Sequence, residues 1–258
     1  MYMKKNAILL LAAVVTIGMI ACSPNRGGHL QGWELVWEDT FGTSLNTSNW
    51  SKMPQGENPR DWFMSDNNSL YRFHEGDLVL IGLRNSEEGE EVQPFITGGI
   101  TTAGNRSFSS VSRIEARLRT IPVEGVMYNM TLLSTTNENV YINVMSRFGL
   151  DRFIYQSVSS DFTQEVMDNP PAMLMITLPS DNYYIFSVEL HADSLVFFVN
   201  NQRMKMYPRI ETDAIGQFPF NEQEFNLFFG VSVNQNPLPE GDFQSFMFID
   251  WVRHFVPE

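Results

Sequence analysis

The sequence has few of the residues on which many protein chemistries depend. It contains one cysteine, Cys22, and four histidines, at positions 29, 74, 191 and 254. A single cysteine cannot form an internal disulfide, and histidines with this spacing do not make a zinc site. A glycine-rich phosphate loop and a Gly-x-Ser-x-Gly nucleophile elbow are also missing. Most cofactor-dependent enzymes are therefore excluded.

Positive charge is also scarce. The chain has 17 Lys and Arg residues against 30 Asp and Glu residues, and its formal net charge is −13. Such a surface repels the phosphates of nucleic acids, so we expect no nucleic-acid partner. Apolar residues make up 43% of the chain, which is enough to build a sizeable core.

The apolar run at the start of the chain is too short to span a bilayer comfortably. It extends from Ile8 to Ile20, follows Lys4-Lys5, and predicts an export signal. It ends in Met19-Ile20-Ala21-Cys22, which resembles a bacterial lipobox. We therefore predict a lipoprotein signal peptide over residues 1–21, with Cys22 as the lipidated mature N-terminus. The alternative is an ordinary secretory signal with an incidental cysteine.

The predicted lipid anchor indicates where the protein acts. Acyl chains on Cys22 would hold it durably on a membrane of the bacterial cell envelope, and residues 22–32 would form a polar tether. The side of the membrane that the protein faces stays open, either periplasmic or surface-exposed.

Residues 33–258 predict a single all-β domain. In Ser112–Thr120 the even positions Ile114, Ala116 and Leu118 are apolar, whereas the odd positions are charged, which is typical of a strand with one face in solvent. Asn200-Asn201 lies between two strand-like runs and predicts a hairpin turn, because asparagine tolerates positive φ. Many short strands joined by Gly, Pro and Asn turns indicate two packed antiparallel sheets.

Five segments then resemble, in the right order, those of glycoside hydrolase family 16, the laminarinase and β-glucanase group. They are Trp33–Phe41, Gly76–Leu80, Ile96–Thr102, Ser112–Leu118 and Met247–Arg253. The resemblance covers nearly the whole predicted mature chain. It implies a concanavalin A-like jelly roll, a β-sandwich whose concave sheet forms a cleft for a β-linked polysaccharide.

The catalytic strand of that family departs from its pattern here. The family signature is Glu-Ile-Asp-Ile-Met-Glu, and the corresponding segment of this chain is Tyr141-Ile142-Asn143-Val144-Met145-Ser146. Tyr141, Asn143 and Ser146 thus stand where the resemblance implies the three catalytic carboxylates. A retaining glycosidase needs two carboxyl groups about 5 Å apart. The nearest carboxylate, Glu138, would point away from the cleft on a regular strand.

The predicted cleft has also lost tryptophans. The family's segment before the catalytic strand carries two, which correspond to Met127 and Thr131. Tyr128, Tyr141 and Asn143 would offer a binding floor, because tyrosine stacks on sugars and asparagine bonds hydroxyl groups. Trp62 would line one end of the cleft, or else anchor a buried loop. The alternative for the whole face is a groove filled by its own side chains.

The resemblance implies no cofactor except a structural calcium ion. Many family members bind this ion through the aspartate that corresponds to Asp250. Asp250 would equally serve to pair with Arg253 or to cap a turn.

Two functions follow from these residues. The first is an envelope-anchored lipoprotein that does not catalyse, and that binds or scaffolds a β-linked polysaccharide of β-glucan or galactan type, or a partner protein. The alternative is an active endo-β-glycanase that hydrolyses O-glycosidic bonds with acids supplied from elsewhere in the chain. Carboxylates converging on the concave face would favour the second.

Overall fold

The structure is a computed structural model that describes residues 30–56, 61–86, 93–149, 153–160, 170–179, 181–212, 216–233 and 241–258. The predicted signal peptide, Cys22 and most of the predicted tether lie outside the described residues. By its contacts the chain divides into residues 1–31 and 32–258, and the second unit forms the domain. In the described part of the chain, no helix is long and apolar enough to cross a membrane.

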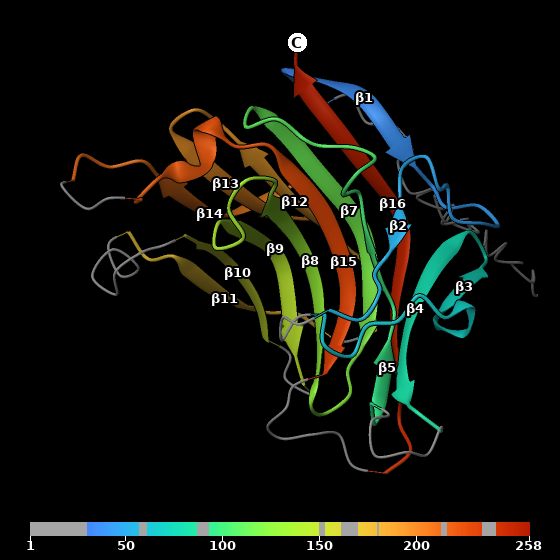
Figure 1. The fold of residues 1–258 in the computed structure, drawn as a ribbon. Helices are drawn as coiled ribbons and strands as arrows, with labels where there is room; N and C mark the ends of the chain where they lie inside the picture. The colour runs from blue at the N-terminus through green and yellow to red at the C-terminus, as the bar shows by residue number, and fades with distance from the viewer. Residues whose placement is uncertain are drawn as a thin grey trace, which may run out of the picture. The chain divides into compact units, whose positions relative to one another are not determined.

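The domain is a sandwich of two antiparallel sheets (Figure 1). The larger sheet contains β1 (Trp33–Asp39), β3 (Tyr71–His74), β4 (Asp77–Arg84), β5 (Phe95–Thr97), β7 (Ser112–Ile121), β12 (Tyr184–Leu190), β13 (Ser194–Val199), β14 (Gln202–Pro208) and β16 (Gln244–Pro257). Its order is β14-β13-β12-β7-β16-β4-β3, with β1 paired to β16 and β5 paired to β4.

The smaller sheet has seven strands in the order β11-β10-β9-β8-β15-β6-β2. They are β2 (Ser51–Lys52), β6 (Gly99–Thr101), β8 (Val126–Ser134), β9 (Tyr141–Phe148), β10 (Phe153–Ser159), β11 (Met173–Thr177) and β15 (Phe225–Val233). Two short 3₁₀ helices, η1 (Asn68–Leu70) and η2 (Pro219–Glu222), complete the described elements. The predicted all-β class and the two antiparallel sheets are confirmed.

The core lies between the sheets and follows the alternation predicted for β7. Ile114 and Ala116 are fully buried and Leu118 is nearly so, because even positions of this strand face the other sheet. The predicted hairpin is also present. Asn200 and Asn201 have φ values of 49° and 64° and join β13 to β14, as expected for a primed two-residue turn.

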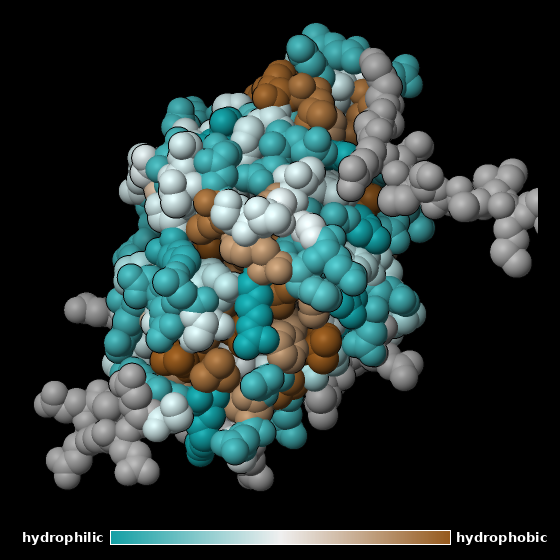
Figure 2. Space-filling model, turned by 90° about the vertical axis from the view of Figure 1, so that its right-hand side faces the viewer, coloured by the Kyte–Doolittle hydropathy of each residue, from teal (hydrophilic) through white to brown (hydrophobic). Residues whose placement is uncertain are grey.

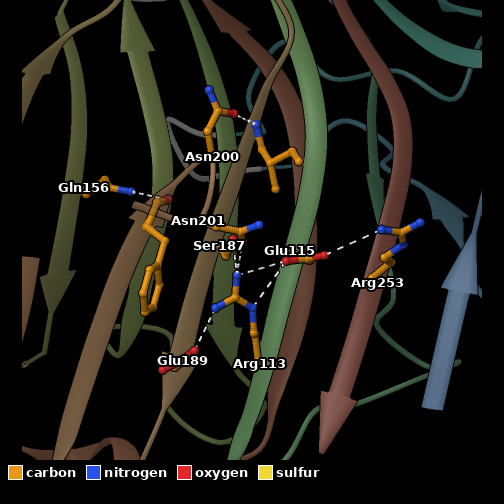
Figure 3. A network of polar contacts seen from close by, with 10 residues as sticks. Arg113, Glu115, Gln156, Ser187, Glu189, Asn200, Asn201 and Arg253 are labelled. Carbon is orange, nitrogen blue, oxygen red and sulfur yellow. Dashed lines mark hydrogen bonds and ion pairs between the residues drawn. The ribbon is translucent and has the colours of Figure 1, made fainter. Parts of the chain in front are cut away.

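The other face of β7 is more buried than the sequence predicts. Arg113 and Glu115 are only 2% and 4% exposed, so the prediction of a solvent-exposed face is wrong for these two residues. The Arg113 guanidinium lies over the Phe198 ring, with its central carbon 4.8 Å from the ring centroid. Its hydrogen-bond partners are Glu115, Ser187, Glu189 and Asn201 (Figure 3).

Figure 2 shows the side of the molecule that carries β1, β3 and β5. Hydrophilic side chains cover most of this side, and apolar ones appear between them in separate groups. Leu35 and Val36 of the edge strand β1 are among the exposed apolar residues.

Candidate functional site

An irregularity in β9 puts Tyr141, Asn143 and Ser146, where the resemblance implies catalytic carboxylates, on one face of the sheet. Thr131 of β8 pairs with Asn143, but Met130 pairs with Met145, so Val144 is an extra residue in β9. The pairing with β10 shifts in the same stretch. Such a bulge reverses the alternation of side chains beyond it. Ser146 therefore shares a face with Asn143, which a regular strand would not allow.

That face is the outer one, which is turned away from the larger sheet. Its polar side chains bond mainly to one another. Asn143 accepts a hydrogen bond from the Thr131 hydroxyl at 3.0 Å and donates one to the Ser157 hydroxyl at 3.0 Å. The Ser146 hydroxyl donates to the Asn129 side-chain oxygen at 2.9 Å. The predicted positions thus form part of a neutral hydrogen-bonded strip of amides and hydroxyls.

The sheet itself has no acid with which to hydrolyse a glycoside. None of the seven strands contains an Asp or Glu residue on either face. Glu138, the nearest carboxylate in the sequence, is exposed in the loop between β8 and β9, and does not occupy a strand position. A serine hydroxyl is too weak an acid to protonate a departing sugar, and an amide does not ionise. Within the described strands of this sheet, the acid and nucleophile of a retaining glycosidase are missing.

The prediction that Tyr128 forms part of the binding floor is wrong. Its side chain is fully buried, and its hydroxyl donates a hydrogen bond to the backbone carbonyl of Ile121. Burial raises the pKa of this phenol far above its usual value. Tyr128 faces the core because side chains alternate along β8, and its neighbours Asn129 and Thr131 occupy the outward-facing positions.

The accessible part of the outer face lies over β9, β10 and β11. Tyr141 and Asn143 are half-buried there, as is Tyr155 of the neighbouring strand. Met173 and Met175, on β11, are 56% and 50% exposed. Tyr155 pairs with Met175, and Ser157 with Met173, so these side chains adjoin the polar strip. Tyr155 and the two methionines are not among the residues expected from the sequence. Alternation along β10 indicates Tyr155, which shares a face with Ser157, but β11 is a continuous apolar run without such a signal.

The opposite part of the face is covered by a loop. The side chain of Met64 lies over the glycines of β6 and β15, and Met64 is 1% exposed. A Cβ atom at Gly99 would lie 2.7 Å from the Met64 sulfur, and one at Gly230 would lie 2.7 Å from its methyl carbon. Since Gly230 pairs with Asn129, this cover reaches the edge of the polar strip. Here the face is filled by the chain's own side chains.

Trp62, two residues before Met64, lines a pocket of about 380 Å³. It is 38% exposed, and its indole N–H donates to the Gln93 side-chain oxygen at 3.1 Å. The pocket is further lined by Gln55, Phe63, Met64, Ser65, Asp66, Asn85, Phe95 and Ile96. An exposed aromatic side chain among amides and hydroxyls suits a sugar ring. Trp62 is therefore placed as a surface residue and not as a buried loop anchor.

Asp250 does not have the surroundings of a calcium ligand. Its carboxylate forms an ion pair with Arg117, and not with Arg253 as considered from the sequence. Arg253 pairs with Glu38 instead. Among the described residues, no group of three or more His, Cys, Asp or Glu side chains could hold a metal ion. The residues around Asp250 therefore do not fit the implied calcium ion.

Comparisons by sequence give no match, either to a family model or to a curated protein. Solved structures do match. The endo-β-1,3-glucanase from Pyrococcus furiosus has a TM-score of 0.75 at 18% identity, covering 88% of this chain and 95% of the other. The laminarinase from Rhodothermus marinus has a TM-score of 0.74 at 19% identity, covering 88% and 98%.

A third match is a glutamate-to-serine variant of SCLam, a non-specific endo-β-1,3(4)-glucanase of family GH16, with 1,3-β-D-cellobiosyl-glucose at its active site. Its TM-score is 0.73 at 15% identity, covering 88% of this chain and 95% of the other. The domain therefore has the jelly-roll fold of glycoside hydrolase family 16, as the resemblance implied. At these identities the likeness shows the fold alone, and the chemistry depends on the residues that this chain carries.

Proposed function

We propose that this protein is a lipid-anchored envelope protein whose jelly-roll domain binds a β-linked glycan without cleaving it. The single observation that carries the proposal is the lack of any Asp or Glu in the seven strands of the cleft-forming sheet. Tyr141, Asn143 and Ser146 supply neither the nucleophile nor the acid that a glycosidase needs.

Binding is supported by what remains on the accessible part of the face. Half-buried Tyr141 and Tyr155 offer aromatic surface beside the Asn143 amide, and the exposed methionines of β11 extend this surface. Sugars bind through stacking on aromatic rings and hydrogen bonds to their hydroxyl groups. In SCLam, a glutamate-to-serine variant still holds a glucan fragment at its active site. Glycan binding on this fold therefore does not require every carboxylate.

The hydrolysis test uses laminarin, mixed-linkage glucan, agar-type galactan and xyloglucan. We expect no measurable reducing sugar, because general acid–base assistance alone contributes roughly 10²- to 10⁴-fold and the covalent route is lost as well. Any cleavage by the wild-type protein would refute the non-catalytic proposal, and cleavage that survives Tyr141→Ala and Ser146→Ala would go further. It would assign the acids to residues elsewhere in the chain, which is the endo-β-glycanase alternative.

Binding is tested by calorimetric titration with the same four glycans. Tyr141→Ala and Trp62→Ala should each weaken binding, because each removes an aromatic surface. Met206→Ala is the matched control, since Met206 is 50% exposed but lies on β14 of the other sheet. If wild-type protein gives no heat with any glycan, the partner-protein role replaces glycan binding.

The anchor is tested separately, on protein purified from its native membrane. We expect mass spectrometry to find acyl chains on Cys22 and no residue before it. A soluble mature form that begins at another residue would contradict the anchoring part of the proposal and leave the glycan-binding part intact.

A further inference from the structure

A cluster of charged and aromatic side chains lies on the outer face of the larger sheet, on the opposite side of the domain from the proposed glycan site. Asp250 of β16 forms an ion pair with Arg117 of β7, and their side chains are 25% and 28% exposed. Asp77, at the start of β4, accepts a hydrogen bond from the Tyr183 hydroxyl. Asp77 and Asp250 are near enough to influence each other electrostatically.

The Tyr183 ring is shared by two guanidinium groups. The guanidinium carbon of Arg117 lies 4.2 Å from the ring centroid, and that of Arg119 lies 5.2 Å from it. Arg119 also lies 4.0 Å from the centroid of Phe248. Cations at these distances from an aromatic ring are attracted to it. Both arginines are therefore held beside the two aspartates by aromatic contacts as well as by charge.

The charges in this cluster balance without a metal. Two carboxylates, from Asp77 and Asp250, face two guanidinium groups, from Arg117 and Arg119. The two arginines carry the same total charge as one calcium ion. Calcium needs six to eight oxygen ligands at about 2.3–2.6 Å. An Asp250 oxygen is already bonded to Arg117, and a divalent cation would be repelled by both guanidinium groups.

We propose that Arg117 takes the place of the structural calcium ion that the fold family implies at Asp250. In this chain the permanent charge of Arg117 neutralises Asp250, Arg119 supplies the second positive charge beside Asp77, and the Tyr183 ring holds both guanidinium groups. An arginine is always protonated at physiological pH and cannot be removed by a chelator. The stability of the domain is then independent of calcium.

The test is thermal unfolding of the full-length protein in calcium chloride, in EDTA, and in potassium chloride of matched ionic strength. We expect the same Tm for the wild type in all three. Arg117→Gln removes the charge but keeps a polar side chain, and we expect a lower Tm in EDTA that calcium restores by binding the exposed carboxylates. Arg203→Gln is the control, because Arg203 is an exposed arginine on β14, at the far edge of the same sheet from the cluster.

Two results would overturn the proposal. One is a wild-type Tm that rises with calcium and falls with EDTA, which would show that the ion binds despite Arg117. The other is an Arg117→Gln variant that folds but does not respond to calcium. If that variant does not fold, calorimetric titration of the wild type with calcium decides, since the proposal requires no binding heat.

Discussion

His254 makes the stability of the domain depend on pH. It lies on β16 and is 8% exposed, with its ring in an edge-on contact with Phe108 at 4.9 Å. Neither ring nitrogen has a hydrogen-bond partner among the described residues. Burial, and secondly the positive charge of Arg106, lower the pKa of this imidazole from 6.5 to about 4. The folded protein therefore holds His254 in its neutral form.

The direction of the pH dependence follows from which state, folded or unfolded, takes up the proton at the higher pH. In the unfolded chain His254 is protonated near pH 6.5, whereas in the folded protein it resists protonation until about pH 4. The stabilising contribution is present above pH 6.5 and is lost as the pH falls toward 4. At 1.36 kcal/mol for each pH unit between the two pKa values, the loss amounts to roughly 3 kcal/mol.

The assay is urea unfolding at several pH values between 4 and 7. His254→Leu should lose less stability than the wild type over this range, with a difference of roughly 3 kcal/mol at its acid end. His74→Leu is the control, because the His74 side chain is 68% exposed. Parallel pH profiles for wild type and His254→Leu would refute the reasoning. Comparing variants at each pH removes the contribution of carboxylates that titrate in the same range.

Two further predictions concern β7. Ile114→Ala should destabilise the domain by about 2–5 kcal/mol, because it leaves a cavity between the sheets. Val111→Ala, at a 40% exposed position just before the strand, should cost much less, and equal costs in urea unfolding would contradict the assigned core. Arg113→Met should cost about 3–5 kcal/mol by leaving Glu115 and its neighbours without their counter-charge, and Arg203→Met, at an exposed position on β14, should be nearly neutral. A stable Arg113→Met variant would show that the charge network contributes specificity and not stability.

The strands could be predicted because their signal is local. Alternation in Ser112–Thr120 gives the parity of β7 directly, and Asn200-Asn201 carries its own turn preference. Alternation cannot show how far the charged face of β7 is exposed to solvent. Arg113 and Glu115 have the sequence pattern of solvent-facing residues, yet side chains from β12, the β13–β14 turn and β16 cover them.

The candidate site could be predicted only in part. The resemblance points to Tyr141, Asn143 and Ser146 as the positions where the family has carboxylates, but the bulge that puts Ser146 on the same face as Asn143 requires the pairing register. The wrong placement of Tyr128 was avoidable, because strand alternation puts Tyr128 on the opposite face from Met127 and Thr131, the positions that correspond to the cleft tryptophans. The cover that Met64 forms over the face was not foreseen, because it depends on a loop distant in sequence.

The sequence by itself determined the all-β class and the parity of β7, because periodicity and turn chemistry act over a few neighbouring residues. The family resemblance, and not periodicity, implied the jelly roll and pointed to Tyr141, Asn143 and Ser146. The tertiary structure alone decided that Asp250 pairs with Arg117, that His254 is buried against the Phe108 ring, and that part of the outer face is closed. Burial and charge pairing join segments more than a hundred residues apart, so only the packed sheets define them.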